Sequence, residues 1–303
     1  MKVNTHNLAV ILVNWNQFDL TRACIISLLE CTYKDFEIFL VDNDSSDNSV
    51  LKLKKEFEKV NYIQNSRNLG FTGANNIGIK YALKRDFEFI MLLNNDTEVE
   101  SDFIEPLLSS FKSNVQLGAV QPLILNYHSK ETVWNFGGTF NSFFGLVQTL
   151  NKGVRRSELK ENYLTDWISG CCFMFKANIA SEIGLLDDFF FVYFEDVDYS
   201  LRIKKAGFEL GLQEKSVIYH HEGASWKKKS KKREGTVSPY THYLRLRNHL
   251  YFNAKHNAEF NFFGKWIYQI FQIFSYILYF TIRLRFNKLK MSVKGFLDGL
   301  KSI

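Results

Sequence analysis

Proline and cysteine are scarce in this chain of 303 residues, with three and four copies, and only 17 residues are glycine. This composition excludes collagen-like and Pro- or Gly-rich low-complexity structure, and a 46% share of hydrophobic residues excludes intrinsic disorder. The cysteines form no CxxC pair, and Cys24 and Cys31 lie about 10 Å apart along an expected helix, too far for a disulfide. Residues 1–7 lead into a strand pattern without a signal-peptide pattern. We therefore expect a core-stabilised protein in the reducing cytoplasm.

Acidic residues are scarce in the last quarter of the chain. Residues 227–303 carry 16 Lys and Arg but only three Asp and Glu, a net charge of +13, whereas residues 1–226 carry a net charge of −7. A basic end on an acidic body favours an anionic partner. Residues 227–233 (KKKSKKR) hold six of these charges and are expected to form a mobile loop that closes over an anionic substrate. Because aromatic and aliphatic residues follow, an anionic membrane surface is preferred over nucleic acid.

The first 125 residues alternate strand patterns with helical patterns. This rhythm predicts an α/β fold with a mostly parallel sheet and helices on both faces. In such sheets ligands bind outside the carboxyl ends of the strands. Polar clusters follow three of the expected strands: Asn14 with Asn16, Asp42 to Ser46, and Asn94 to Asp96. Asn and Asp are also common in ordinary turns, but three clusters at one edge favour a site.

Three motifs carry side chains that are suited to chemistry. Asp96 follows an apolar strand, where its carboxylate can hold a divalent cation that bridges two phosphates. The segment 195–198 gathers three acids and can supply a general base, although acids in a first helical turn also complement the helix dipole. His220 can offer a neutral imidazole to a metal, although a lone His is more often structural.

Eight segments together resemble family 2 glycosyltransferases, with a rhamnosyltransferase-like group as the closest branch. They keep the family's order from Val10 to Asn248: VILVNWN (10–16), VDNDSSDNS (41–49), NSRNLGFTGANNIGI (65–79), LLNNDTEV (92–99), WISGC (167–171), LLDDFFFVYFEDVDYSLRIKKAGF (185–208), VIYHHEGAS (217–225) and RLRN (245–248). The resemblance implies a GT-A fold, a dTDP- or UDP-linked sugar donor, a Mg²⁺ or Mn²⁺ cofactor and inversion at the anomeric carbon.

The resemblance also implies roles for single residues. Asp196 matches the catalytic base, and Asp96 and His220 match the metal ligands. Asp42 matches the contact to the nucleotide base, and Arg67 matches a loop near the diphosphate. The full set implied at the donor is Asn14, Trp15, Asp42, Asn43, Arg67, Asn68, Asn94 and Asn95. The set implied at the acceptor is Trp167, Ser169, Gly170 and Glu195. One position departs from the family, because Asn94 stands where the DxD motif begins with Asp, which removes a charge near the metal.

The chain is expected to divide at residue 225. Residues 1–225 form the predicted catalytic domain, with a nucleotide-binding half at 1–125 and an acceptor half at 126–225. Residues 226–303 hold the basic loop and a helical appendage. Residues 266–282 carry no charge but fall short of the roughly 20 apolar residues of a spanning helix.

The polar residues around 266–282 form one narrow stripe at helical spacing. We expect this helix to lie on an anionic membrane. The cations expected at the lipid headgroups are Arg283, Arg285, Lys288 and Lys290. The alternative is a helix that packs on the catalytic core or across a homodimer interface.

The leading hypothesis is an inverting glycosyltransferase at the inner face of the plasma membrane. It would move a sugar, with rhamnose as first candidate, to a saccharide or polyprenyl-diphosphate-linked acceptor in surface polysaccharide synthesis. The alternative sugars are galactofuranose, glucose, galactose and N-acetylhexosamine. A nucleotidyltransferase would normally open with a Gly-rich phosphate loop, which VILVNWNQFD lacks. A non-catalytic nucleotide-sugar-binding protein would need no base, so the acids at 195–198 disfavour it.

Overall fold

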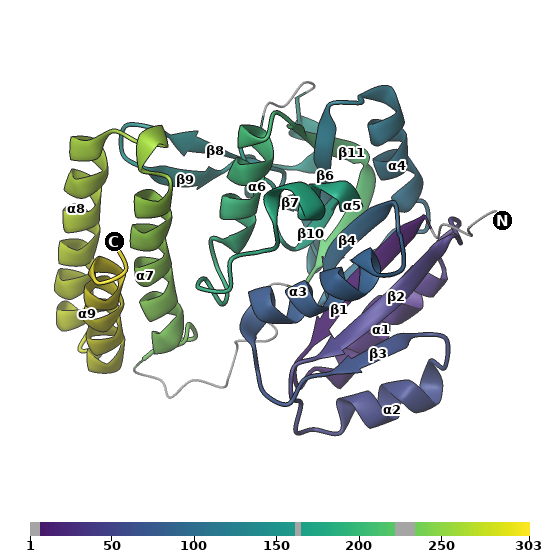
Figure 1. Cartoon of the computed structure of the whole chain (residues 1–303). Helices are drawn as coiled ribbons and strands as arrows, with labels where there is room; N and C mark the ends of the chain where they lie inside the picture. The colour runs from purple at the N-terminus through teal and green to yellow at the C-terminus, as the bar shows by residue number, and fades with distance from the viewer. Residues whose placement is uncertain (1–6, 161–164, 222–233) are drawn as a thin grey trace. The chain divides into compact units, whose positions relative to one another are not determined.

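The protein, shown as a computed structural model in Figure 1, divides into two compact units. The first, here called the sheet unit, consists of Met1–Gly138, Thr149–Phe191 and Glu195–Ser225. The second, the helical unit, consists of Thr139–Gln148, Val192–Phe194 and Trp226–Ile303. The residues that the structure describes are 7–160, 165–221 and 234–303. The basic stretch 227–233, for which a mobile loop is predicted, lies outside them. The sequence pattern places 139–148 and 192–194 in the catalytic domain, whereas their contacts group them with the C-terminal helices.

A nine-stranded sheet forms the centre of the sheet unit. Its strand order is β3-β2-β1-β4-β10-β6-β11-β5, with β7 paired to β6. The strands are β1 (Leu8–Asn14), β2 (Phe36–Asp42), β3 (Asn61–Gln64), β4 (Phe89–Asn94), β5 (Thr97–Val99), β6 (Leu117–Asn126), β7 (Ser129–Asn135), β10 (Cys172–Lys176) and β11 (Glu209–His220). The strands β1 to β4 pair in parallel, but β10 runs antiparallel to both β4 and β6. The sheet is therefore mixed rather than mostly parallel, because an apolar run predicts burial and not direction.

Helices cover both faces of this sheet, as predicted. Alternate residues of β1 join opposite cores: Leu8, Val10 and Leu12 join one, and Ala9 and Ile11 join the other. The first core includes residues of α1 (Phe18–Leu29), α2 (Ser49–Glu56) and α4 (Ile104–Ser113). The second includes residues of α3 (Gly70–Leu83), α5 (Ala177–Ile183) and α6 (Glu195–Lys205). The sheet is thus buried between two layers of helices, and its ligand-binding groups must lie at the strand ends.

The strand register gathers the polar strand ends at one edge. Asn14 lies beside Asp42 because β1 and β2 are parallel and in register. On the other side of β1, Val13 lies beside Asn94 at the end of β4. The short strand β5 then pairs antiparallel with β11 and sets His220 beside Thr97. The predicted polar clusters and His220 therefore meet at the carboxyl edge of the parallel strands.

Three long helices dominate the described part of the helical unit: α7 (Pro239–Lys255), α8 (Phe262–Ile282) and α9 (Phe286–Leu300). Ser238 and Asn261 are the N-cap residues of α7 and α8, and each side chain accepts a backbone N–H of the first turn. The helices α9 and α7 pack closely at Gly295. A Cβ at this position would overlap the carbonyl oxygen of Tyr243. The remaining described elements are β8 (Gly138–Asn141), β9 (Leu146–Thr149) and two 3-10 turns at Arg156–Glu158 and Asn257–Glu259. No helix among the described residues meets the length and hydropathy that a membrane span requires.

Candidate active site

A buried hydrogen-bond network joins the ends of β1, β2 and β4. The side-chain amide of Asn14 donates to Asp42 Oδ1 at 2.9 Å and to Ser45 Oγ at 3.0 Å. Thr21 Oγ1 donates to Asn14 Oδ1 at 2.9 Å and accepts from the amide of Asn95 at 2.7 Å. Asn14 and Asp42 are almost fully buried, so this network forms the floor of the predicted donor site.

Two residues of the predicted base-binding position keep capacity for a ligand. Trp15 follows β1 and is 37% exposed, so part of its side chain is accessible to a ligand. Asp42 accepts one hydrogen bond from Asn14 and one from the backbone N–H of Ser45, at 3.0 Å. Because a carboxylate accepts about four hydrogen bonds, Asp42 can accept further donors.

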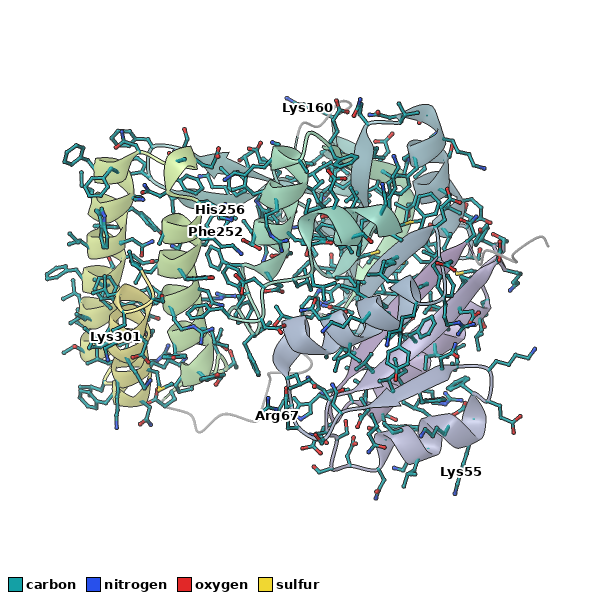
Figure 2. The ribbon with its side chains drawn as sticks, in the orientation of Figure 1. Lys55, Arg67, Lys160, Phe252, His256 and Lys301 are labelled. Carbon is teal, nitrogen blue, oxygen red and sulfur yellow. The ribbon has the colours of Figure 1, made fainter. Side chains whose placement is uncertain are left out.

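Asn43 holds the loop that carries Arg67 and Asn68. Its side-chain NH₂ donates to Asn68 Oδ1 at 2.9 Å and to the carbonyl oxygen of Gly70 at 3.0 Å. Its oxygen accepts the backbone N–H of Leu69 at 2.9 Å. Most of the hydrogen-bonding capacity of Asn43 is therefore used within the chain, and its observed role is to position the loop. Arg67 stands exposed on this loop (Figure 2).

Asp96 and His220 form a buried pair at the junction of β5 and β11. Asp96 Oδ1 lies 3.2 Å from His220 Nε2, and the backbone N–H of His221 donates to the carbonyl oxygen of Asp96 at 2.9 Å. The ring of Trp134 packs edge-on against the His220 imidazole, with centroids 4.3 Å apart. Burial alone would raise the pKa of Asp96, but the hydrogen bond and charge of His220 hold it below its usual value. Asp96 is therefore an ionised carboxylate at neutral pH.

The residues present at this pair fit a divalent cation. Neighbouring ligands of an octahedral ion lie about 3.0 Å apart when each bond is about 2.1 Å, close to the observed 3.2 Å between Asp96 Oδ1 and His220 Nε2. Nδ1 of the buried His220 has no hydrogen-bond partner among the described residues, so a cation bound at Nε2 would leave Nδ1 to carry the proton of the neutral ring. Those residues hold no group of three or more His, Cys, Asp or Glu for a metal. A cation here would need phosphate oxygens and water as its other ligands.

Backbone N–H groups fix the carboxylate of Asp196, the second residue of α6. The N–H of Gly170 donates to Asp196 Oδ2 at 2.9 Å, and the N–H of Val197 donates to Oδ1 at 2.8 Å. A Cβ on Gly170 would lie 3.3 Å from the ring of Phe71 and 3.4 Å from Asp196 Cβ, so this approach favours glycine. The carboxylate has a fixed orientation and keeps acceptor capacity on both oxygens.

Glu195 and Asp196 are neighbouring carboxyl groups in different environments. Burial first, and then the charge of Asp196, raises the pKa of Glu195 well above its usual value. Burial also raises the pKa of Asp196, but the N–H groups of Gly170 and Val197 oppose that rise. Oε2 of Glu195 is buried without a hydrogen-bond partner in the described part of the chain. We therefore assign the proton to Glu195 and the negative charge to Asp196.

The other residues predicted at the acceptor are also buried. Trp167 and Ser169 are 6% and 5% exposed. The N–H of Ser169 donates to Gln121 Oε1 at 2.6 Å, and its hydroxyl accepts the N–H of Cys171 at 3.2 Å. These bonds hold the segment that presents the N–H of Gly170 to Asp196. Contact of this segment with an acceptor stays a prediction.

Cys171 links the two halves of the candidate site. Its carbonyl oxygen accepts the N–H of Asn94 at 2.9 Å, and β10 begins at the next residue. Burial raises the pKa of its thiol most, and the charges of both Asp96 and Asp196 raise it further. Gly170, whose N–H binds Asp196, and Cys171, whose carbonyl oxygen binds Asn94, are consecutive residues, so the predicted base and the strand end that carries Asp96 lie in a common region.

The backbone just before α6 is strained, which no sequence motif predicts. Phe191, Tyr193 and Phe194 have φ angles of 63°, 73° and 74°, which bulky residues seldom adopt. In the helical unit, the amide of Asn248 donates to the carbonyl oxygens of Val192 at 2.9 Å and Tyr193 at 2.8 Å. Strain of this kind concentrates at functional sites. An aromatic run carries no signal for it, because such residues ordinarily favour extended backbone.

Asn76 on α3 is a second residue that the sequence analysis missed. Its NH₂ donates to the carbonyl oxygen of Leu186 and to Asp188 Oδ1, both at 2.8 Å. Its oxygen accepts the N–H of Leu186 at 3.0 Å. Asn76 thereby fastens the loop before the strained segment to α3. The available signal was a polar residue at a buried position of a helix, which usually has a fixed partner.

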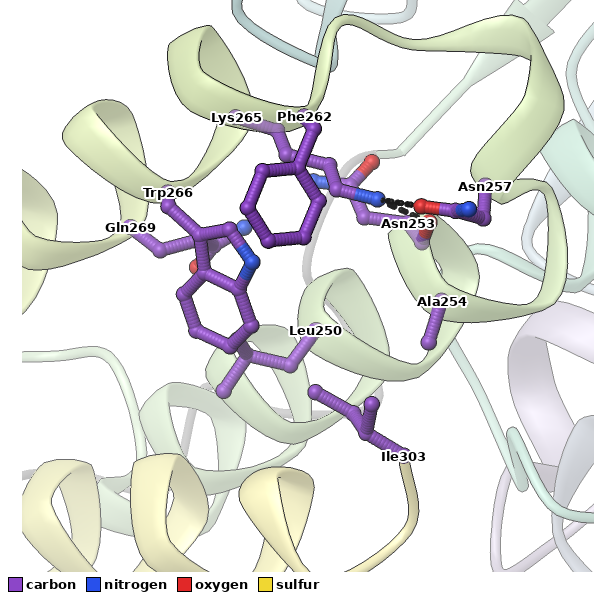
Figure 3. Close-up of a pocket in the computed structure, with 9 residues that line it drawn as sticks. All are labelled: Leu250, Asn253, Ala254, Asn257, Phe262, Lys265, Trp266, Gln269 and Ile303. Atoms are coloured by element: carbon purple, nitrogen blue, oxygen red, sulfur yellow. Dashed lines mark hydrogen bonds between the residues drawn. The ribbon is translucent and has the colours of Figure 1, made fainter.

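The helical unit encloses a cavity of about 330 Å³, and no residue of the predicted site lines it (Figure 3). The ammonium of Lys265 donates to the carbonyl oxygen of Asn253 at 3.3 Å and to Asn257 Oδ1. Neither amide atom of Gln269 has a hydrogen-bond partner among the residues described. The lining residues are Leu250, Asn253, Ala254, Asn257, Phe262, Lys265, Trp266, Gln269 and Ile303.

The mixed sheet between two helix layers matches the GT-A glycosyltransferase fold. The family model of glycosyl transferase family 2 matches residues 9–184, and the chain belongs to this family. The predicted family and GT-A fold are thus confirmed. The rhamnosyltransferase-like branch is not singled out.

Two curated relatives resemble the chain over much of its length. The low-salt glycan biosynthesis hexosyltransferase Agl10 of Haloferax volcanii is 30% identical over 179 residues, covering 58% of this chain and 55% of that protein. A poly-beta-1,6-N-acetyl-D-glucosamine synthase of Staphylococcus epidermidis is 24% identical over 242 residues, covering 75% of this chain and 54% of that protein. The chain thus spans about half the length of the curated relatives that it matches.

A solved structure agrees on the fold. The crystal structure of GalNAc-T7 with UDP, GalNAc and Mn²⁺ matches with a TM-score of 0.61 over 83% of this chain and 48% of that chain. The sequence identity is 18%, so the match concerns the fold alone.

Proposed function

We propose that this protein is an inverting glycosyltransferase that moves a hexosyl group from a nucleoside-diphosphate sugar to an acceptor hydroxyl. One observation carries the proposal: Gly170 binds the carboxylate of Asp196, and the next residue, Cys171, binds Asn94 at the strand end that carries the Asp96–His220 pair. Inverting transfer needs these two functions, because the leaving diphosphate must be neutralised while the attacking hydroxyl loses its proton.

In this proposal the nucleotide binds over the ends of β1 and β2. Trp15 offers its exposed surface, and Asp42 can accept the N–H of a uracil or thymine base, which supports a UDP- or dTDP-linked donor. Arg67, on the loop that Asn43 holds, brings a cation to the diphosphate. The remaining proposed donor residues are Asn14, Asn68, Asn94 and Asn95.

A Mg²⁺ or Mn²⁺ ion on Asp96 and His220 would supply the charge that stabilises the leaving diphosphate. The low pKa of Asp96 keeps its carboxylate ionised for this role. Asn94 contributes a neutral amide where the family pattern has a carboxylate. The pair would then offer one protein negative charge to the cation, and the donor phosphates would supply the rest.

Asp196 would accept the proton of the attacking acceptor hydroxyl. The N–H groups of Gly170 and Val197 fix its orientation before the acceptor binds. The neighbouring Glu195 holds its own proton and therefore leaves Asp196 as the ionised partner. A single displacement with one base inverts the anomeric carbon and needs no covalent intermediate. The acceptor would approach along Trp167 and Ser169.

The proposed sugar is a hexose or an N-acetylhexosamine. The named activities of the two curated relatives support these over rhamnose, which stays a candidate together with galactofuranose. The proposed acceptor is a saccharide, free or linked to polyprenyl diphosphate, in surface polysaccharide synthesis. The proposed location is the cytoplasmic face of the plasma membrane.

The test measures sugar transfer and nucleoside-diphosphate release with a panel of UDP- and dTDP-sugars in Mg²⁺ or Mn²⁺. Asp196→Asn should lower kcat about 10²–10⁴-fold, the size of a general-base effect, while the donor Kd from calorimetry stays nearly unchanged. Asp166→Asn is the matched control, because Asp166 is a partly exposed carboxylate of the same unit that pairs with Lys204. Lost donor binding in Asp196→Asn would make Asp196 a donor ligand. Absence of turnover with every donor would overturn the proposal.

A further inference from the structure

The helix α8 is oriented against the usual rule for a surface helix. Its buried side chains include Lys265 and Gln269, which are 5% and 1% exposed. The ammonium of Lys265 bonds to Asn253 and Asn257, near the end of α7. A helix on a globular protein normally turns its polar side to water and its apolar side to the core. In the helical unit, α8 does the reverse.

The opposite side of α8, here called the outer face, is apolar and exposed. Ile270, Phe271 and Phe274 at its centre are 60%, 66% and 65% exposed. The residues of the outer face are Phe263, Ile267, Ile270, Phe271, Phe274, Ile277, Leu278 and Ile282. They recur at spacings of three and four and so form one strip along the helix. A continuous apolar strip on a protein surface marks a binding surface.

Positive charge borders the outer face and constrains what can cover it. Arg283 follows α8, is exposed and lies 5.9 Å from the ring centre of Tyr279, and Lys290 is exposed on the next helix. The prediction that Lys288 meets the headgroups is wrong, because its side chain is 2% exposed. Residues 234–303 carry ten Lys and Arg against three Asp and Glu, a net charge of +7. Two copies of the chain that met through this face would bring these like charges together. The charge therefore favours an anionic, apolar partner over a second copy.

Aromatic side chains also border the outer face. Trp266 and Tyr279 lie at its two edges at helical spacing. Figure 3 shows the rings of Phe262 and Trp266 near each other among the residues that line the cavity. Trp, Tyr and basic residues are enriched where proteins meet lipid headgroups. The border of the outer face thus has the composition of a membrane–water interface.

We propose that the outer face of α8 docks onto the surface of a bilayer that contains anionic lipid, with the helix axis in the plane of that surface. The apolar side chains would enter the acyl region, and Arg283 and Lys290 would meet the headgroups. The helix would lie on the bilayer rather than across it, because the side that carries Lys265 and Gln269 is buried within the protein. The proposal is independent of glycosyl transfer, since docking is measured without turnover.

The experiment sediments the full-length protein with vesicles of phosphatidylcholine, alone or mixed with phosphatidylglycerol. The protein should bind the anionic vesicles, and high salt should release only part of it, because the apolar contacts are not screened. The double variant Phe271→Ser/Phe274→Ser should bind at least about tenfold more weakly. The matched control is Leu51→Ser/Val115→Ser, which removes side chains that are 61% and 79% exposed in the sheet unit and should bind as the wild type does.

A charge variant keeps the test decisive if the first variant misfolds. Arg283→Gln/Lys290→Gln should weaken binding to anionic vesicles about tenfold or more and leave the circular dichroism spectrum unchanged. Absence of wild-type binding, or equal losses in the control pair, would overturn the proposal. A wild-type dimer that Phe271→Ser/Phe274→Ser splits, with no vesicle binding, would assign the outer face to a second copy instead.

Discussion

The two units bury their apolar segments in opposite ways. In the sheet unit, residues 8–12 of β1 have no exposed surface, because helices cover both faces of the sheet. In the helical unit, α8 is also rich in apolar residues, yet Lys265 and Gln269 are buried and Phe271 and Phe274 are exposed. An apolar sequence therefore indicates that a segment is buried against something. It does not indicate whether the buried surface is covered by the same chain or by a partner.

The chemistry is divided in the same way. All residues predicted at the donor, the metal, the base and the acceptor lie in the sheet unit. The helical unit holds the outer face and the cavity beside Lys265. Substitutions in one unit should therefore change catalysis or core stability, and substitutions on the outer face should change neither.

The largest expected effect tests the close packing of the core in the sheet unit. Phe173 in β10 is 1% exposed, and its ring lies 5.8 Å from that of Tyr199. Phe173→Ala should lower the free energy of unfolding by about 3–5 kcal/mol, because it leaves a cavity between sheet and helix. Urea denaturation measures the loss. A cost of less than about 1 kcal/mol, typical of a surface site, would contradict the dense packing.

The second prediction separates chemistry from packing. Asp96→Ala should lower kcat/KM about 10²–10³-fold, because the cation loses its carboxylate and the diphosphate loses its stabilising charge. Calorimetry should also show that Mn²⁺ no longer strengthens donor binding. Asp102→Asn, at an exposed carboxylate of the same unit, is the control. Metal dependence that survives in Asp96→Ala would remove Asp96 from the metal site.

The third prediction concerns the inner contacts of the helical unit. Gly295→Ala should cost about 1–3 kcal/mol, because the new methyl group would overlap the backbone of Tyr243 and push α9 from α7. Thermal unfolding followed by circular dichroism measures the shift. Lys290→Ala, at an exposed position of the same helix, should leave stability unchanged. Equal stability of both variants would show that the helices do not pack closely.

The fourth prediction is a pH dependence of stability. The raised pKa of Glu195 means that the folded protein keeps this proton at a pH where the unfolded chain, with a value near 4.5, has released it. The wild type should therefore lose stability as pH rises above that value, by up to about 1.4 kcal/mol per pH unit. Glu195→Gln should flatten this slope and gain stability relative to the wild type as pH rises. Parallel curves from pH 5 to 8 would contradict the assignment of the proton.

The smallest expected effect completes the comparison. Phe274→Ala should change the free energy of unfolding by less than about 0.5 kcal/mol, because the ring is 65% exposed and its removal leaves no cavity in the core. Urea denaturation beside Phe173→Ala gives a direct contrast between the two units. A cost of several kcal/mol would mean that the outer face packs within the protein.

Much of the catalytic half follows from sequence for a physical reason. A strand between two helix layers must be apolar throughout, so β1 and β4 stand out, and their polar ends mark the ligand edge. The partnership of Asp96 with His220 rests on strands far apart in sequence, and only the family resemblance suggested it.

The remainder depends on partners that local sequence does not encode. The sequence does not predict that β10 pairs antiparallel with β4 and β6, because an apolar run indicates burial and not the direction of the strand. The polar stripe of α8 was visible, but its inward orientation depends on the carbonyl and amide groups that Asn253 and Asn257 offer. The hydrogen bonds from Asn43 to the loop that carries Arg67 likewise could not be predicted, because they depend on where the folded chain places this loop.

The strained turn before α6 has a mechanical consequence. The chain enters the helical unit at Val192, leaves it at Phe194, and begins α6 with the next residue. Asn248 on α7 grips the carbonyl oxygens of Val192 and Tyr193, and only three peptide bonds separate Tyr193 from Asp196. The hydrogen bonds of Asn248 therefore fix the backbone only a few residues before the carboxylate of Asp196, and loss of these bonds would free the strained residues that lead into α6.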